Sequence, residues 1–162
     1  DLKQPILFLA DEGREEEVVV RLSRVGYDNA VGFLQGGIKA WKEAGLETDS
    51  IKEISANDFA SLYQMDTEHI NLLDARRKSE FDSEHLMGAE NFPLDFINQN
   101  MSQLSRDKKY FIHCAGGYRS VIMCSILKAR GFDKLVNIQG GYKSLSQTGL
   151  KKTHYVEPTT ML

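Results

Sequence analysis

An internal repeat constrains the fold of this chain more than any other feature of its sequence. The copies lie about 105 residues apart, and each begins with a short apolar run, ILFLA at 6–10 and YFIHC at 110–114. Both continue with a polar turn, a stretch with apolar residues at helical spacing, a second apolar run, the letters QGG and another amphipathic stretch. Strand, helix, strand and helix in this order predict an α/β fold with a parallel sheet.

The copies match at turn glycines and at equivalent helix positions, which argues against chance. The matched glycines are Gly26, Gly36, Gly37 and Gly45 in the first copy and Gly131, Gly140, Gly141 and Gly149 in the second.

Only the second copy has a front half. A helix start at Ser55, a strand in HINLLDAR (69–76) and a further helix in DFINQNMSQL (95–104) precede it. We therefore expect residues 49–162 to form a three-layer α/β/α domain with a central parallel sheet. Residues 1–48 would be the truncated rear half of a partial second copy, joined by a linker near 47–50.

A half-copy of this kind leaves sheet edges and apolar strand surface uncovered. We expect residues 1–48 to pack against the second unit or against another copy of the chain, so a homodimer is one expected assembly. The incomplete copy and the first residue, Asp1, favour a chain excised from a longer protein.

Composition and charge exclude several classes of protein. Hydrophobic residues make up 41% of the chain and the net charge is only -3, which excludes an intrinsically disordered chain. The 20 basic residues do not outnumber the 23 acidic ones, so we expect no nucleic-acid partner. No apolar run approaches the ~18 residues of a membrane helix and none opens the chain as a signal peptide would, so we expect no membrane partner.

The two cysteines, Cys114 and Cys124, are too few for a disulfide framework. Cys124 lies more than one turn down the helix predicted after Cys114, which places it poorly for a bridge. Two free thiols predict a reducing, cytoplasmic environment. Cys124 fits a core residue better than a resolving thiol.

The stretch YFIHCAGGYRS at 110–120 places Cys114 between the end of a strand and the start of a helix. Ligands of open α/β sheets bind at this edge, where unpaired backbone N–H groups and the helix dipole favour a thiolate with a lowered pKa. Gly116 and Gly117 would let the backbone curl through positive φ.

The next two residues fit the same chemistry. Arg119 would direct a positive charge toward an anion, and Ser120 would cap the helix. These features together favour a reactive Cys114 over the alternative, a buried and inert cysteine at an ordinary strand–helix turn.

Residues 50–150 resemble a rhodanese domain, the fold of sulfurtransferases. The resemblance rests on LLDAR at 72–76, SEFDSEHLMGAENFPL at 79–94, CAGGYR at 114–119 and QGG at 139–141. The first copy resembles the rear of the same domain, with LADEGR at 9–14 where the loop would be and Leu9 or Ala10 in place of the cysteine. That replacement implies that the first copy is catalytically inactive.

The resemblance implies a double displacement. The Cys114 thiolate would take the outer sulfur of thiosulfate or a small persulfide, and the resulting persulfide would pass it to a thiophilic acceptor.

Cys114 and Arg119 are the expected catalytic residues, with Arg119 binding the anionic oxygens of the donor. The expected substrate-binding residues are Ala115, Gly116, Gly117, Tyr118 and Ser120, and the expected supporting residues are Asp74 and Arg76. No cofactor is implied.

Ala115 and Gly116 depart from thiosulfate-using members of the family, which carry basic residues just after the cysteine. This argues against efficient use of thiosulfate.

The tandem arrangement is most similar to the C-terminal part of metallo-β-lactamase–rhodanese fusion proteins, which implies an attached hydrolase or persulfide dioxygenase domain. The alternative function is then a sulfur-carrying or regulatory module for that domain, without turnover of its own.

A phosphatase of the same fold is the less favoured enzyme. Such phosphatases also begin their loop with His-Cys, as His113 and Cys114 do, but their loop is one residue longer than the stretch Ala115 to Tyr118. A tighter ring suits one sulfur better than a phosphoryl group.

Several other side chains have structural interpretations. Glu80 matches a family position that supports the loop's surroundings, and His85 matches a frequent family histidine with a structural role. Tyr118 would gate the pocket or pack over it. The histidines show no metal-ligand spacing, so no metal site is expected; they are His69, His85, His113 and His154.

Overall fold

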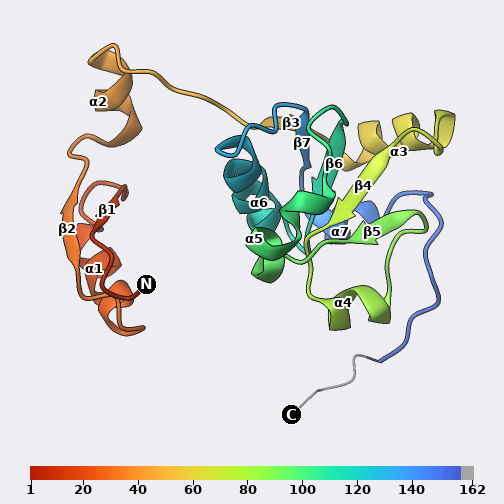
Figure 1. Cartoon of the computed structure of the whole chain (residues 1–162), viewed down its shortest axis with the longest axis horizontal. Helices are drawn as coiled ribbons and strands as arrows, with labels where there is room; N and C mark the ends of the chain where they lie inside the picture. The colour runs from red at the N-terminus through yellow and green to blue at the C-terminus, as the bar shows by residue number, and fades with distance from the viewer. Residues whose placement is uncertain (158–162) are drawn as a thin grey trace. The chain divides into compact units, whose positions relative to one another are not determined.

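The computed structural model describes residues 1–157 and divides the chain into two compact units. The first unit is Asp1–Ser50 and the second begins at Ile51, at the end of the expected linker. Figure 1 shows both units along the chain. The last residues of the expected second domain, 158–162, lie outside the described residues.

The first unit alternates strands and helices. Strand β1 (Ile6–Phe8) pairs in parallel with β2 (Ala30–Phe33), and helices α1 (Glu15–Ser23) and α2 (Gly37–Glu43) follow these strands in turn. No residue of the unit is buried. The predicted strand–helix–strand–helix order is present, and the descent of this unit from an inactive half-repeat stays a prediction.

The second unit contains a five-stranded parallel sheet in the order β3-β7-β6-β4-β5. Its strands are β3 (Lys52–Ile54), β4 (Asn71–Asp74), β5 (Ala89–Asn91), β6 (Tyr110–His113) and β7 (Leu135–Ile138). The order places the end of β6 at the centre of the sheet, flanked by the ends of β7 and β4.

Helices cover both faces of this sheet. The helices of this unit are α3 (Ala56–Met65), α4 (Lys78–Ser83), the 3-10 helix η1 (Leu94–Phe96), α5 (Ile97–Asn100), the 3-10 helix η2 (Met101–Gln103), α6 (Tyr118–Lys128) and α7 (Gly141–Leu145). Residues of α5 and α6 form a core on one face, and residues of α3 and α7 form a second core on the other. The predicted three-layer α/β/α architecture is confirmed.

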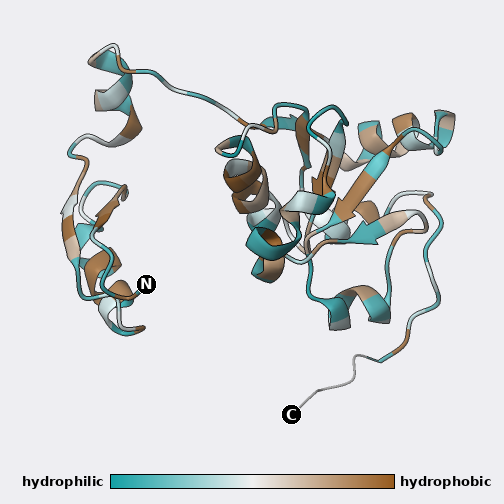
Figure 2. Cartoon of the chain, in the orientation of Figure 1, coloured by the Kyte–Doolittle hydropathy of each residue, from teal (hydrophilic) through white to brown (hydrophobic). Residues whose placement is uncertain are grey.

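Alternation along the strands explains the two cores. On adjacent positions of β4, Leu72 belongs to the α3–α7 core and Leu73 to the α5–α6 core, and Phe111 and Ile112 divide in the same way on β6. A strand buried on both faces is mostly apolar, which is why YFIH and LVNI are short apolar runs with one polar residue each, His113 and Asn137. Figure 2 shows hydrophobic colouring along the central strands and on α6.

A local signal places the start of α3 correctly. The Ser55 hydroxyl accepts a hydrogen bond from the Asp58 N–H at 3.1 Å, as the helix-start signature predicted. The single helix expected over 95–104 is wrong, because that segment divides into η1, α5 and η2. Strand β3 was not foreseen, since its letters KEI carry no apolar run.

The described part of the tail packs on the second unit. Lys152 forms an isolated bridge with Leu86, and the Val156 N–H donates to the Ser83 carbonyl at 2.8 Å. Among residues 1–157, no helix has both the length and the apolar character that a membrane crossing requires.

Candidate active site

Cys114 directly follows β6 at the carboxyl edge of the sheet. The neighbouring strand β4 ends at Asp74, and the Ala75 N–H donates to the His113 carbonyl at 2.8 Å. On the other side, β7 leads into the glycines before α7. Three chain segments that are distant in sequence therefore meet around one sulfur atom.

Hydrogen bonds converge on the Cys114 sulfur. Its Sγ accepts from the Gly117 N–H at 3.2 Å and from the Ser120 hydroxyl at 3.5 Å, and the residue is only 1% exposed. Burial opposes ionisation of the thiol, but hydrogen bonds from Ser120, Gly117 and Gly116 together outweigh it and hold the pKa of Cys114 below its ordinary value. The loop therefore stabilises a thiolate.

The start of α7 fixes the outer side of the loop. The Tyr142 N–H donates to the Cys114 carbonyl at 2.6 Å, and the Lys143 N–H donates to the Ala115 carbonyl at 3.0 Å. These bonds direct loop carbonyls toward α7. A Cβ on Gly141 would lie 2.4 Å from the Cys114 carbonyl oxygen, so only glycine fits this close approach.

A buried ion pair lies beneath the loop. The Arg76 guanidinium donates to both Asp74 carboxylate oxygens, from Nε to Oδ1 at 3.0 Å and from Nη2 to Oδ2 at 2.7 Å. Arg76 also donates to the Glu84 carbonyl at 2.8 Å and lies over the Tyr142 ring at 4.0 Å. The pair ties β4 to α4 and α7, which is a supporting role.

His113 packs at the base of the loop. Its Nδ1 donates to the Cys114 carbonyl at 3.3 Å, and its Nε2 lies 3.8 Å from the Asp74 carboxylate. Burial lowers the pKa of His113, so the ring is neutral near pH 7 and holds the strand end without adding charge.

Arg119 forms a bidentate ion pair with Glu80 of α4. The distances are 2.6 Å from Nη1 and 2.9 Å from Nη2. The hydrogen bond from Arg119 holds the pKa of Glu80 below its usual range. The guanidinium that was expected to bind a donor's oxygens therefore already has a carboxylate partner.

Residues 55–148 match the family described as Rhodanese-like domain. The chain belongs to the rhodanese-like family. Across 85 residues it is 31% identical to a sulfurtransferase of Allochromatium vinosum, covering 52% of this chain and 79% of that protein. It is 28% identical over 93 residues to the Bacillus subtilis protein YqhL, covering 57% of this chain and 71% of that protein.

Solved structures agree with this assignment. A rhodanese-like domain protein from Staphylococcus aureus superposes with a TM-score of 0.56 at 29% identity, over 62% of this chain and 97% of that one. A rhodanese-related protein from Thermoplasma volcanium gives a TM-score of 0.55 at 26% identity, over 63% and 97%. A fusion to a metallo-β-lactamase-type hydrolase stays a prediction from the sequence.

The structure of the rhodanese-like unit brings the expected site residues together, with three differences. The N-cap of α6 is Gly117, at φ 107°, so the N-cap expected at Ser120 is wrong because the helix begins at Tyr118. Positive φ occurs at Gly117 and not at Gly116. The Tyr118 side chain is 81% exposed, so it does not pack over the loop.

Sequence reasoning missed two residues of the support. The Tyr142 hydroxyl donates to the Glu84 carboxylate at 2.6 Å, and this pair links α7 to the end of α4 beside Arg76. The aromatic residue directly after QGG was the available signal. The pairing of Glu80 with Arg119 could not be seen in the sequence because 39 positions separate them.

The remaining candidates have structural roles. His85 stacks on Phe81 at 3.7 Å between ring centroids, which is a structural role. Burial raises the pKa of Cys124 to about 12, so this thiol stays protonated in the core. Among the described residues, no group of three His, Cys, Asp or Glu side chains could hold a metal ion.

Proposed function

We propose that the second unit is a sulfurtransferase that carries a persulfide on Cys114. The observation that carries this proposal is the set of hydrogen bonds that Cys114 Sγ accepts from Gly117 and Ser120. The same donors that favour a thiolate can hold the sulfur of a persulfide. The resemblance to a named sulfurtransferase supports the proposal at the level of the family.

The reaction has two displacements. First, the Cys114 thiolate attacks the outer sulfur of the donor, an S–S bond forms, and the donor's own S–S bond breaks. The electron pair of the broken bond leaves on sulfite if the donor is thiosulfate, or on a thiolate if the donor is a persulfide. Second, a thiophilic acceptor attacks the outer sulfur, and the electron pair of the S–S bond returns to Cys114 Sγ.

The charges at the loop favour a small persulfide as donor. Arg119 is paired with Glu80, and Ala115 and Gly116 are neutral. An anion such as thiosulfate must compete with the Glu80 carboxylate for the guanidinium.

A carrier module is the second candidate function, and the same neutral loop favours it. Such a module would take up sulfur for an attached hydrolase or persulfide dioxygenase and transfer it slowly by itself. Release of thiocyanate in the presence of cyanide separates the two candidates, since only the enzyme produces it over many turnovers.

The intact mass of the full chain after exposure to thiosulfate or a small alkyl persulfide tests the proposal. We expect a gain of one sulfur atom that disappears in Cys114→Ser and persists in Cys124→Ser. Absence of any gain with every donor would contradict both sulfur functions. Release of phosphate from an aryl phosphate would instead establish the phosphatase, which the short loop disfavours.

A further inference from the structure

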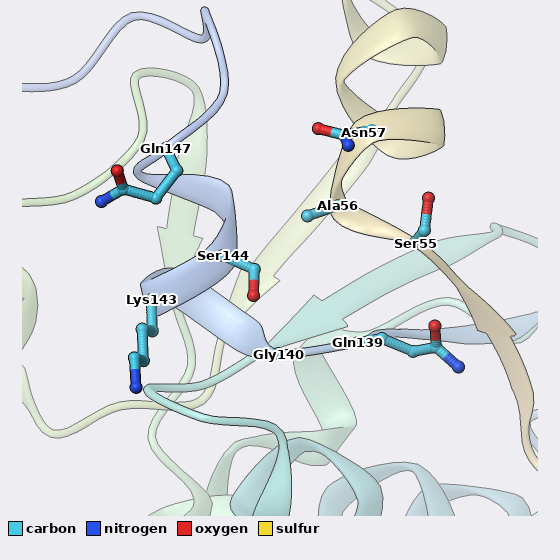
Figure 3. Close-up of a pocket in the computed structure, with 8 residues that line it drawn as sticks. All are labelled: Ser55, Ala56, Asn57, Gln139, Gly140, Lys143, Ser144 and Gln147. Carbon is cyan, nitrogen blue, oxygen red and sulfur yellow. The ribbon is translucent and has the colours of Figure 1, made fainter.

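A groove of about 530 Å³ opens beside the active loop, between the start of α3 and the turn from β7 into α7. Figure 3 shows polar side chains from both segments around it. Its lining residues are Ser55, Ala56, Asn57, Gln139, Gly140, Lys143, Ser144 and Gln147. None of the roles assigned above to the loop uses the side chains of this groove.

The groove adjoins the Cys114 loop through two of its lining residues. The Lys143 N–H bonds the Ala115 carbonyl at 3.0 Å. A Cβ on Gly117 would lie 3.7 Å from the Gly140 nitrogen. A molecule in the groove is therefore close to the loop that holds the sulfur, at the same edge of the sheet.

The charge of the groove differs from that of the loop. Lys143 is the one charged lining residue, it is exposed, and within residues 1–157 no carboxylate oxygen lies within 4.0 Å of its ammonium. The loop's own cation, Arg119, is instead held by Glu80. An anionic group in the groove thus finds an available positive charge at Lys143.

Nearby carboxylates do not line the groove. Glu53 accepts hydrogen bonds from Asn137 and Gln139, and Asp58 accepts one from the Ser55 hydroxyl at 2.6 Å. Asn57, Ser144 and Gln147 add amide and hydroxyl donors elsewhere in the lining of the groove. A cation and neutral donors in one groove suit a carboxylate, which accepts several hydrogen bonds at once.

We propose that the groove at Lys143 binds the carboxylate of a small anionic thiol, which accepts the sulfur carried on Cys114. This rests on the proposed function. The thiolate of the acceptor attacks the outer sulfur of the Cys114 persulfide, a new S–S bond forms on the acceptor, and the electron pair of the broken bond returns to Cys114 Sγ. The carboxylate takes no part in the chemistry and orients the thiol.

Matched thiols test the proposal on the full chain loaded with sulfur at Cys114. Mercaptopropionate and mercaptohexanoate are compared with mercaptopropanol and mercaptohexanol, which replace the carboxylate by a hydroxyl at two chain lengths. We expect Lys143→Gln to raise the ratio of the carboxylate KM to the alcohol KM about three- to tenfold at low salt, and the native ratio to rise with salt. Lys108→Gln, which removes the same charge before the start of β6, should keep the native ratio.

The outcomes distinguish failure of the sulfurtransferase proposal from failure of the acceptor site at Lys143. If Cys114 takes up no sulfur, the proposed function falls and this acceptor site falls with it. If Cys114 takes up sulfur and Lys143→Gln leaves the ratio unchanged at both chain lengths, the groove is not the acceptor site and the sulfurtransferase proposal stands. Lys143→Arg should restore much of the native ratio, because it restores the charge.

Discussion

The first unit and the rear half of the second unit have nearly the same local backbone. Both alternate strand, helix, strand and helix, and both pair their two strands in parallel. The turn glycines agree closely, with φ of 87°, 73° and 59° at Gly26, Gly36 and Gly37, and of 84°, 72° and 57° at Gly131, Gly140 and Gly141.

Burial is where the two regions differ. Every residue of β6 and β7 is buried, whereas β1, β2 and the rest of the first unit contain no buried residue. In the second unit, β3 lies beside β7 and β4 lies beside β6, so both strands have a neighbour on each side. In the first unit, β1 and β2 have only each other. Local sequence thus sets the backbone in both regions, and the front half supplies the packing in one.

The same difference decides where a site can exist. In the first unit Arg14 pairs with Glu17, only one helical turn away. At the matching place in the second unit, Arg119 pairs with Glu80 of the front half. A Cβ on Gly37 would meet nothing within 4 Å, whereas one on Gly141 would overlap the Cys114 carbonyl.

The largest expected effect comes from alanine at these two matched glycines. Gly141→Ala should lower the free energy of unfolding of the second unit by about 3 kcal/mol and slow sulfur transfer by at least about tenfold, because the new methyl group displaces the loop. Gly37→Ala should cost only about 1 kcal/mol, the strain of positive φ alone. Hydrogen exchange measured by mass spectrometry assigns each change to its unit, and equal losses in the two variants would contradict the comparison.

The same contrast explains how much could be predicted from the sequence. Elements such as β6, β7 and the helix start at Ser55 depend on short-range patterns, so the sequence predicts them well. Strand β3 was missed because its edge position leaves Lys52 and Glu53 exposed. The partners of Arg119 and Tyr142 come from distant segments, and no local pattern specifies which carboxylate they meet.

A smaller effect should follow from removing the Ser120 hydroxyl, whose place in the first unit is taken by Glu15. Hydrogen bonds from Ser120 favour the Cys114 thiolate, so Ser120→Ala should raise the pKa of Cys114. The thiolate then forms at higher pH, and the midpoint of the pH profile for alkylation of Cys114 should shift upward. The measurement uses a Cys124→Ser background, with Ser125→Ala on the exposed side of the same helix as control.

A downward shift of that midpoint in Ser120→Ala would contradict the assigned role of the hydroxyl. An equal shift in Ser125→Ala would show a general effect of α6 instead. The backbone N–H of Gly117 remains in both variants, so part of the lowering of the pKa should persist.

The smallest expected effect concerns the ion pair between Arg119 and Glu80. The matching arginine of the first unit, Arg14, pairs instead with a glutamate only three positions away in the chain. Glu80→Gln keeps an acceptor for the Arg77 N–H and removes the charge that competes with anionic donors. We expect stability to fall by about 0.5 kcal/mol, as for other partly exposed ion pairs, and the KM for thiosulfate to fall about threefold. Asp82→Asn removes the same charge from α4 at a side chain that pairs with Lys78, and it should leave this KM unchanged. A higher KM in Glu80→Gln would mean that Glu80 positions Arg119 for the donor, which would make the front half a contributor to binding as well as to packing.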